Sequence, residues 1–83
     1  MYRIKIIPAA QKDLDYFPSK QFRQITTAIT KLSLNPRPPG NLKLTNEEGY
    51  RIRVGKYRIL YRIDDHSKEI YIYRIKHRKD VYR

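Results

Sequence analysis

The sequence predicts an α+β fold in which two N-terminal helices pack on one face of a small antiparallel β-sheet. One observation is that apolar and basic residues alternate through residues 50–78, as they do in strands with one buried face. Another is that residues 9–34 carry apolar side chains at the spacing of helical turns. With 83 residues, the chain has the length of one domain, so we expect a single domain over residues 1–83 in the order β-α-α-β-β-β.

The N-terminal segment predicts a short strand followed by a helix. Apolar and basic residues alternate in Tyr2–Ile7, and Pro8 ends this strand and suits the first turn of a helix. In Ala9–Phe17, Ala10 and Leu14 recur at helical spacing. We therefore expect this short helix to place one apolar stripe against the sheet.

A second helix is expected over Lys20–Leu34. Ser19 is a candidate N-cap, and Asn35-Pro36 stops the helix because the residue before a proline avoids the α region. The apolar stripe of this helix consists of Phe22, Ile25, Ile29 and Leu32. An antiparallel helix pair laid on the apolar face of the sheet would bury both stripes. Residues 42–44 are a candidate for a further short strand segment.

The turn at residues 55–56 predicts the pairing of the strands on either side. Gly at the first of two central positions suits a type II′ hairpin turn. Such a turn sets Val54 opposite Tyr57 and Arg53 opposite Arg58. The apolar residues of both strands then share one face, and a slip by one residue would exchange the two faces.

The turn between the last two strands is predicted to be a five-residue loop over residues 64–68. This loop would place Arg58 opposite Arg74 on the last strand. The loop would also assign Ile70 and Ile72 to the basic face, and Tyr71, Tyr73 and Ile75 to the apolar face.

Basic side chains from three strands are expected to share the face that is not apolar. They are Arg51, Arg53, Arg58, Arg62, Arg74, Lys76 and Arg78. Two unit charges about 4 Å apart repel by roughly 1 kcal/mol in water and by roughly 4 kcal/mol at an effective dielectric constant of about 20. Because arginine stays protonated, this face predicts an anionic ligand. The formal net charge of +11 likewise favours nucleic acid or an acidic protein as the partner.

Composition excludes several other classes of site. The chain has no cysteine, and its two histidines, His66 and His77, are not spaced with carboxylates as in a metal site. We therefore expect neither a metal nor another cofactor. No apolar run approaches the roughly 20 residues that cross a bilayer, and the N-terminus lacks the apolar core of a signal peptide. These observations predict a soluble cytoplasmic protein without a membrane partner.

The order of elements and three segments resemble the RelE branch of the RelE/ParE superfamily, the toxins of type II toxin–antitoxin systems. The segments are residues 49–54 (Gly-Tyr-Arg-Ile-Arg-Val), 57–61 (Tyr-Arg-Ile-Leu-Tyr) and 75–83 (Ile-Lys-His-Arg-Lys-Asp-Val-Tyr-Arg). The resemblance implies a metal-independent mRNA endoribonuclease that cuts messages in the ribosomal A site, with the message's own 2′-hydroxyl as nucleophile. It implies catalytic roles for Arg51, Arg53, Arg58, Arg78 and Tyr82. Independently of the resemblance, Arg74 and Lys76 on the basic face, together with His77, are candidates for RNA contacts.

The parity of the last strand qualifies one of these roles. By alternation, His77 points with the core, which favours a structural role over catalysis although histidine is a common proton-transfer residue. The resemblance further implies a cognate antitoxin, the ribosome and mRNA as partners, with promoter DNA bound only through the antitoxin complex. Two alternatives remain open: a ParE-like toxin that inhibits DNA gyrase, and a non-catalytic RNA-binding module.

Overall fold

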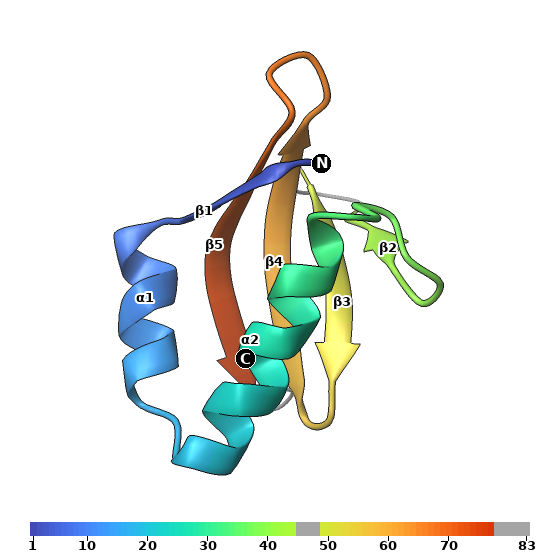
Figure 1. The fold of residues 1–83 in the computed structure, drawn as a ribbon. Helices are drawn as coiled ribbons and strands as arrows, with labels where there is room; N and C mark the ends of the chain where they lie inside the picture. The colour runs from blue at the N-terminus through green and yellow to red at the C-terminus, as the bar shows by residue number, and fades with distance from the viewer. Residues whose placement is uncertain (45–48, 78–83) are drawn as a thin grey trace.

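Two helices cover one face of a five-stranded sheet, as Figure 1 shows. The computed structural model describes residues 1–44 and 49–77. The elements are β1 (Arg3–Ile6), α1 (Pro8–Asp15), α2 (Ser19–Leu32), β2 (Leu42–Lys43), β3 (Tyr50–Val54), β4 (Tyr57–Asp64) and β5 (Glu69–His77). The strand order across the sheet is β1-β5-β4-β3-β2. The predicted α+β architecture is therefore confirmed, with β2 as a short additional edge strand.

The sheet is mixed, whereas the sequence predicted an antiparallel one. β1 runs parallel to β5, with Ile4 opposite Ile70 and Ile6 opposite Ile72. The chain leaves β1 through both helices and returns through β2, β3 and β4 before β5 reaches β1. This pairing joins segments more than 60 residues apart, so the alternation within either segment could not reveal its direction.

The core lies between the helices and the near face of the sheet. It consists of Ala10, Leu14, Ile25, Ile29, Leu32, Ile52, Ile59, Tyr61, Ile70, Ile72 and Ile75. Two details of α2 differ from the expectation. Phe22 is 41% exposed and so lies outside the buried stripe. Ser19 is the first helical residue, because Pro18, with extended backbone angles, occupies the N-cap position where no N–H is needed.

The predicted β3–β4 hairpin is confirmed residue for residue. Val54 lies opposite Tyr57, and Arg53 lies opposite Arg58. Gly55 has φ = +59°, a left-handed value that glycine adopts without steric cost. The two-residue turn and the buried apolar face together leave only this register.

The predicted β4–β5 register is wrong. The loop has four residues, 65–68, because Asp64 still pairs with Glu69. A register shift at Leu60/Tyr61 then inserts one extra residue in β5, so that Arg58 lies opposite Lys76 and not opposite Arg74.

This β-bulge also changes which side chains are buried. Ile70 and Ile72 are fully buried in the core, whereas Tyr71 lies opposite Arg62 on the other face. Beyond the extra residue, Ile75 returns to the core, as predicted. Burial of every isoleucine in β5 is thus achieved, and each such burial stabilises the fold by about 1.5–3 kcal/mol.

A hydrogen-bonded cluster joins the β4–β5 turn to the segment after α2. The guanidinium of Arg37 donates to Oδ2 of Asp65 at 2.9 Å, and the hydroxyl of Tyr2 donates to Oδ1 at 2.6 Å. The Arg37 guanidinium also lies over the ring of Tyr50, 5.2 Å from its centroid. The hydrogen bond from Arg37, and then that from Tyr2, lower the pKa of Asp65 to about 2.

Asp65→Asn is expected to lower the Tm at neutral pH and to remove part of the loss of stability in acid. The folded-state pKa of Asp65 lies below its unfolded value of about 3.9. The carboxylate therefore stabilises the fold above that value, and the contribution disappears as the pH falls toward about 2. Thermal unfolding by circular dichroism across this range measures both effects. Asp15→Asn, at an exposed position of α1, is the control; an unchanged acid limb in the Asp65 variant would contradict the assignment.

Gly49→Ala is expected to destabilise the fold by about 2 kcal/mol or more. Gly49 has φ = +121°, and a Cβ there would lie 2.5 Å from the backbone oxygen of Tyr61. Gly40→Ala is the matched control, because Gly40 also has a positive φ, +91°, but a Cβ there would meet nothing within 4 Å. Urea denaturation compares the two variants; equal losses of stability would show that the close approach to β4 does not matter.

Candidate nucleic-acid interface

The face of the sheet turned away from the helices, here called the open face, collects most of the predicted site. Its residues follow from strand alternation and register: Arg3 and Lys5 of β1, Glu69, Tyr71, Arg74 and Lys76 of β5, Arg58, Leu60 and Arg62 of β4, and Arg51 and Arg53 of β3. The core residues of the same strands point to the helices. In the view of Figure 1 the helices lie in front of the sheet, so the open face is turned away from the reader.

Three cations lie side by side across neighbouring strands, and we call Arg53, Arg58 and Lys76 the basic row. Arg53 lies opposite Arg58 on one side, and Lys76 lies opposite Arg58 on the other. Neighbouring strands are about 4.8 Å apart. The Arg58 side chain at the centre is buried, with 6% exposure, whereas Arg53 is exposed. The row therefore holds a desolvated guanidinium between two further positive charges.

Arg51 and Leu60 lie one step along the strands from the basic row. Arg51 lies opposite Leu60, which in turn lies opposite Arg74. Arg51 and Arg53 also line a groove of about 570 Å³ between the edge of β3, α2 and residues 38–40. A volume of this size is within the range of small-molecule and cofactor sites.

Arg74 lies on the open face as predicted, but its guanidinium is engaged by α1. Its Nε donates to Oδ2 of Asp13 at 3.0 Å, and the backbone N–H of Ile75 donates to the same oxygen at 2.8 Å. Asp13 thus fastens α1 to β5. The predicted contact of Arg74 with RNA remains a prediction.

His77 lies on the helix side, opposite Tyr57 at the end of β5. The two rings meet edge to face, with centroids 5.3 Å apart and an interplanar angle of 86°. With Asp13 and Phe17, they line a pocket of about 280 Å³ under α1. The parity argument for His77 is therefore confirmed, and its ring lies on the opposite side of the sheet from the basic row.

Two of the five predicted catalytic residues, Arg78 and Tyr82, lie outside the described residues. The structure brings Arg51, Arg53 and Arg58 together on the open face. It does not test their catalytic role.

The sequence prediction missed several residues of the open face. Arg3 and Lys5 reach it because β1 pairs with β5, and their alternation with Ile4 and Ile6 was the signal available. Tyr71 was assigned to the wrong face because the loop was predicted one residue too long and the bulge was not foreseen. Isoleucine is fully buried more often than tyrosine, and this preference would have placed Tyr71 on the open face.

The far end of the open face combines aromatic rings with charges of both signs. The guanidinium of Arg62 lies 5.7 Å from the ring centroid of Tyr71 and 6.0 Å from that of Tyr73. The Tyr71 hydroxyl donates to Oε1 of Glu69 at 2.7 Å, and this hydrogen bond raises the pKa of Tyr71. Lys5 contacts the other oxygen of Glu69 at 2.9 Å.

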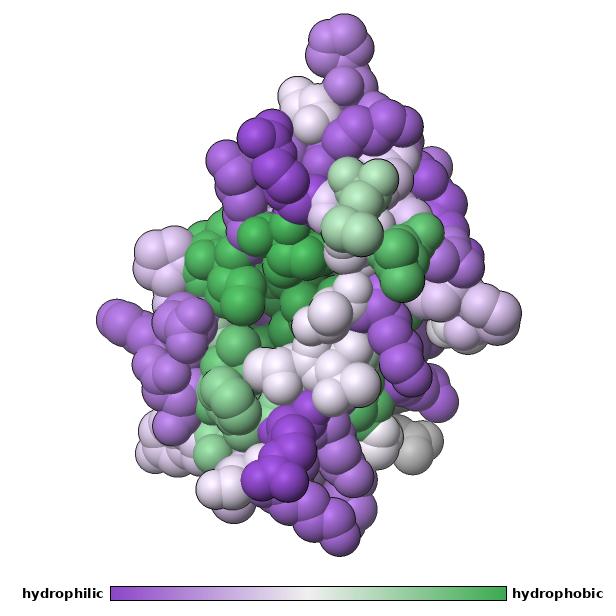
Figure 2. Space-filling model, viewed as in Figure 1, coloured by the Kyte–Doolittle hydropathy of each residue, from purple (hydrophilic) through white to green (hydrophobic). Residues whose placement is uncertain are grey.

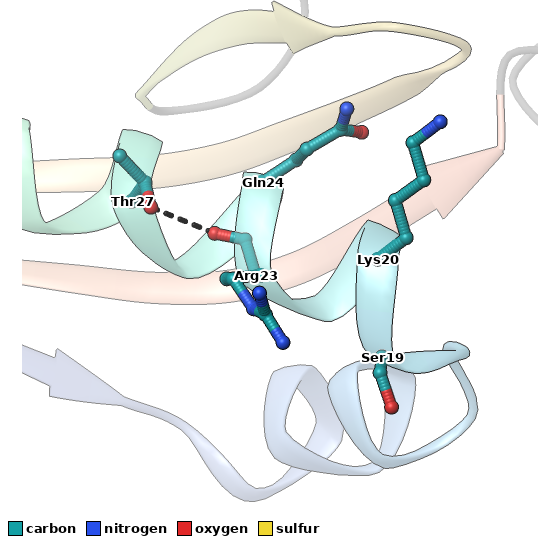
Figure 3. A pocket seen from close by; sticks show the side chains of 5 residues that line it. All are labelled: Ser19, Lys20, Arg23, Gln24 and Thr27. Carbon is teal, nitrogen blue, oxygen red and sulfur yellow. Dashed lines mark hydrogen bonds between the residues drawn. The ribbon is translucent and has the colours of Figure 1, made fainter.

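A hollow of about 610 Å³ on α2 has no comparable chemistry. It is lined by Ser19, Lys20, Arg23, Gln24 and Thr27, shown in Figure 3. All five side chains are exposed and come from one helix, and the Thr27 hydroxyl donates to the backbone oxygen of Arg23 at 2.8 Å. No strand contributes to this hollow, which is a dip in the helix surface.

Among residues 1–44 and 49–77, no three His, Asp or Glu side chains lie close enough together to hold a metal ion. Neither helix that the structure describes is long and apolar enough to cross a membrane.

Comparison with known proteins identifies the class. The chain matches, over residues 4–82, the family described as the ParE toxin of the type II toxin–antitoxin system parDE. It is 33% identical to the toxin RelG of Mycobacterium tuberculosis, over 99% of this chain and 97% of that one. The fold and these matches define a toxin of a type II toxin–antitoxin system.

Solved structures narrow the assignment. The RelBE2 toxin–antitoxin complex from M. tuberculosis matches with a TM-score of 0.82 and 30% identity, over 93% of this chain and 98% of that one. The RelE–RelB complex from Pyrococcus horikoshii OT3 matches with a TM-score of 0.80 and 30% identity, over 93% and 94%. The family model has the ParE name, but the relatives have RelE-type names. The chain therefore belongs to the RelE/ParE superfamily, in its RelE branch.

Asp13→Ala is expected to destabilise the fold by about 1–3 kcal/mol. The change removes the acceptor of the Ile75 N–H and the ion-pair partner of Arg74, and the Asp13 side chain is only 19% exposed. Urea denaturation measures the loss, with Asp15→Ala on the exposed side of α1 as control. Combining Asp13→Ala with Arg74→Ala should give less than the sum of the two losses; strict additivity would mean that the two side chains do not interact.

Proposed function

We propose that this toxin is a metal-independent mRNA endoribonuclease that acts in the ribosomal A site and thereby inhibits translation. The observation that supports the proposal is the basic row, in which Arg53, Arg58 and Lys76 adjoin one another with the central guanidinium buried. A phosphodiester bound over this row would reduce the repulsion between its members. The repulsion for charges about 5 Å apart is about 3 kcal/mol per pair at an effective dielectric constant of 20.

The proposed reaction requires the protein to stabilise negative charge and does not require a protein side chain as the nucleophile. The message's 2′-oxygen attacks the adjacent phosphorus, the bond from phosphorus to the 5′-oxygen breaks, and the products are a 2′,3′-cyclic phosphate and a 5′-hydroxyl. The 2′-hydroxyl loses a proton and the 5′-oxygen gains one. Guanidinium groups can donate two N–H bonds to one phosphate, and donors fixed before the reaction stabilise the charge that develops on its oxygens.

The individual roles follow from position and resemblance. Arg58 and Arg53 hold the phosphate undergoing cleavage, and Arg51 holds the strand at the groove beside β3. Arg78 near the leaving group and Tyr82 on a base or the 2′-hydroxyl remain predictions from the family resemblance. Lys76 joins the phosphate site, while His77 supports Tyr57 from the helix side.

The proposed protein partner is a cognate antitoxin. The solved complexes named above contain RelB antitoxins with toxins of this fold. We propose that an acidic segment of the antitoxin covers the open face. On the helix side, Figure 2 shows apolar side chains grouped between α1 and α2, with polar side chains around them, and an amphipathic antitoxin segment would cover this region. Ribosome and mRNA are the other partners, and promoter DNA is bound only through the antitoxin complex.

A second candidate function has one observation in its favour. The matching family model is the ParE toxin of parDE systems. ParE toxins are the gyrase-inhibiting members of the superfamily that the sequence resembles. A non-catalytic RNA-binding module would also use the open face. The three arginines of the predicted catalytic set that gather there favour an RNA-directed function over gyrase inhibition, and message cleavage distinguishes the ribonuclease from a binding module.

The decisive variants are Arg53→Ala and Arg58→Lys. Arg58→Lys retains the charge but loses the two-pronged donor, and Arg53→Ala changes an exposed side chain, so both should fold. Each is expected to reduce message cleavage, measured by primer extension in a translating extract, by about 10²–10³-fold. Arg23→Ala on α2 is the matched control and should cleave normally.

The same extract separates the alternatives. Cleavage that stops when translation is blocked supports action in the ribosome, and cleavage that continues supports a free-standing ribonuclease. Intact messages together with inhibited DNA supercoiling would support the hypothesis that the toxin inhibits DNA gyrase. Full cleavage by both variants would show that the basic row is not the site.

A further inference from the structure

We propose that Arg62, Tyr71 and Tyr73 form a stacking platform for an unpaired nucleobase of the RNA strand whose phosphate the basic row holds. This inference rests on the proposed function and adds a second nucleotide site to the open face. The platform stands apart from the predicted catalytic set, and Arg62 is four residues along β4 from Arg58, about 13 Å away. A phosphate at the row and a base at the platform would thus belong to different nucleotides.

The platform is held in place before any ligand binds. Arg62 lies over both tyrosine rings, at 5.7 Å and 6.0 Å from their centroids. The Tyr71 hydroxyl is fixed by Glu69 at 2.7 Å, and Glu69, only 8% exposed, is itself held by Lys5 at 2.9 Å and Arg3 at 3.3 Å. Contacts that run from β1 to β5 therefore fix the ring of Tyr71.

The outer side of the platform is open to a ligand. Arg62 is exposed although its guanidinium lies over the tyrosines. Unpaired RNA bases stack on arginine guanidinium planes and on aromatic rings, and each such stack contributes about 1–3 kcal/mol. A base laid on Arg62 would complete a stack of base, guanidinium and tyrosine.

The surroundings favour a base over a phosphate or an acidic peptide. Arg62 and Tyr71 line a pocket of about 430 Å³ whose other walls include Asp64 and Asp65. With Glu69 close by, three carboxylates lie at this end of the open face. Glu69 is paired with Arg3 and Lys5, and Asp65 is paired with Arg37, so this end carries charges of both signs with a smaller cation excess than the basic row. A nucleobase is neutral, and its amino groups can donate to carboxylates. The open face thus has a cationic row for phosphate toward one end and aromatic rings for a base toward the other.

The test uses a short single-stranded RNA that is 2′-O-methylated throughout, so that it binds without being cut. One base is replaced by 2-aminopurine, whose fluorescence falls on stacking, and the replacement is moved along the strand. With the unaltered protein, we expect quenching at one position. Arg62→Ala should abolish the quenching and weaken binding about tenfold, which corresponds to about 1.4 kcal/mol.

Two further variants make the result specific. Arg62→Lys retains the charge but lacks the planar guanidinium, so it should lose quenching and affinity as Arg62→Ala does. Arg23→Ala removes an arginine from α2 and should give the quenching and affinity of the unaltered protein. Normal quenching and affinity in both Arg62 variants would overturn the platform. Normal affinity in Arg62→Lys alone would also overturn it, because charge would then be sufficient.

The measurements distinguish a failure of the platform from a failure of the ribonuclease proposal. Quenching that depends on Arg62 in a protein that never cleaves messages would support the platform and reject the ribonuclease. Cleavage dependent on Arg58, together with quenching indifferent to Arg62, would do the reverse. If the Arg62 variants instead lose binding only to an acidic antitoxin, this end of the open face is a protein contact and the platform is wrong.

Discussion

The burial of isoleucines on the helix side of β3, β4 and β5 is the constraint on which the rest of the structure depends. Ile52, Ile59 and Ile75 lie opposite one another in neighbouring strands, and all three belong to the core. Side chains alternate along a strand, so their neighbours must point to the other face. Burying each isoleucine stabilises the fold by about 1.5–3 kcal/mol. A slip of one strand by one residue would turn the isoleucine of that strand to the open face.

The basic row is a consequence of this constraint. Its members repel by about 1 kcal/mol per pair in water and by about 3 kcal/mol at an effective dielectric constant of 20, for charges about 5 Å apart. Arg58, at 6% exposure, experiences the less polar environment. The core outweighs this repulsion, so the protein folds with the charges together. An anion bound over the row would reduce this repulsion.

The sequence predicted correctly the strand pairing whose signals come from residues close together in the chain. The two-residue turn at Gly55 and the alternation around it determined the β3–β4 pairing, and with it the gathering of Arg51, Arg53 and Arg58. The parallel pairing of β1 joins distant segments and left no local trace. The β4–β5 register failed because the loop is one residue shorter than predicted and because one extra residue in β5 reverses the parity of the strand beyond it. These errors placed Tyr71 in the core and hid the aromatic end of the open face.

The same bulge connects the core to the site. Before the extra residue, alternation buries Ile70 and Ile72 and turns Tyr71 outward; beyond it, alternation buries Ile75 and turns Arg74 and Lys76 outward. An unbroken strand could not satisfy both halves, because one set of isoleucines would then face solvent. The irregularity thus retains the hydrophobic core along the whole of β5 and still presents aromatic and cationic side chains on one face. A single RNA strand running along β4 would meet the two kinds of side chain in succession, as its alternating bases and phosphates require.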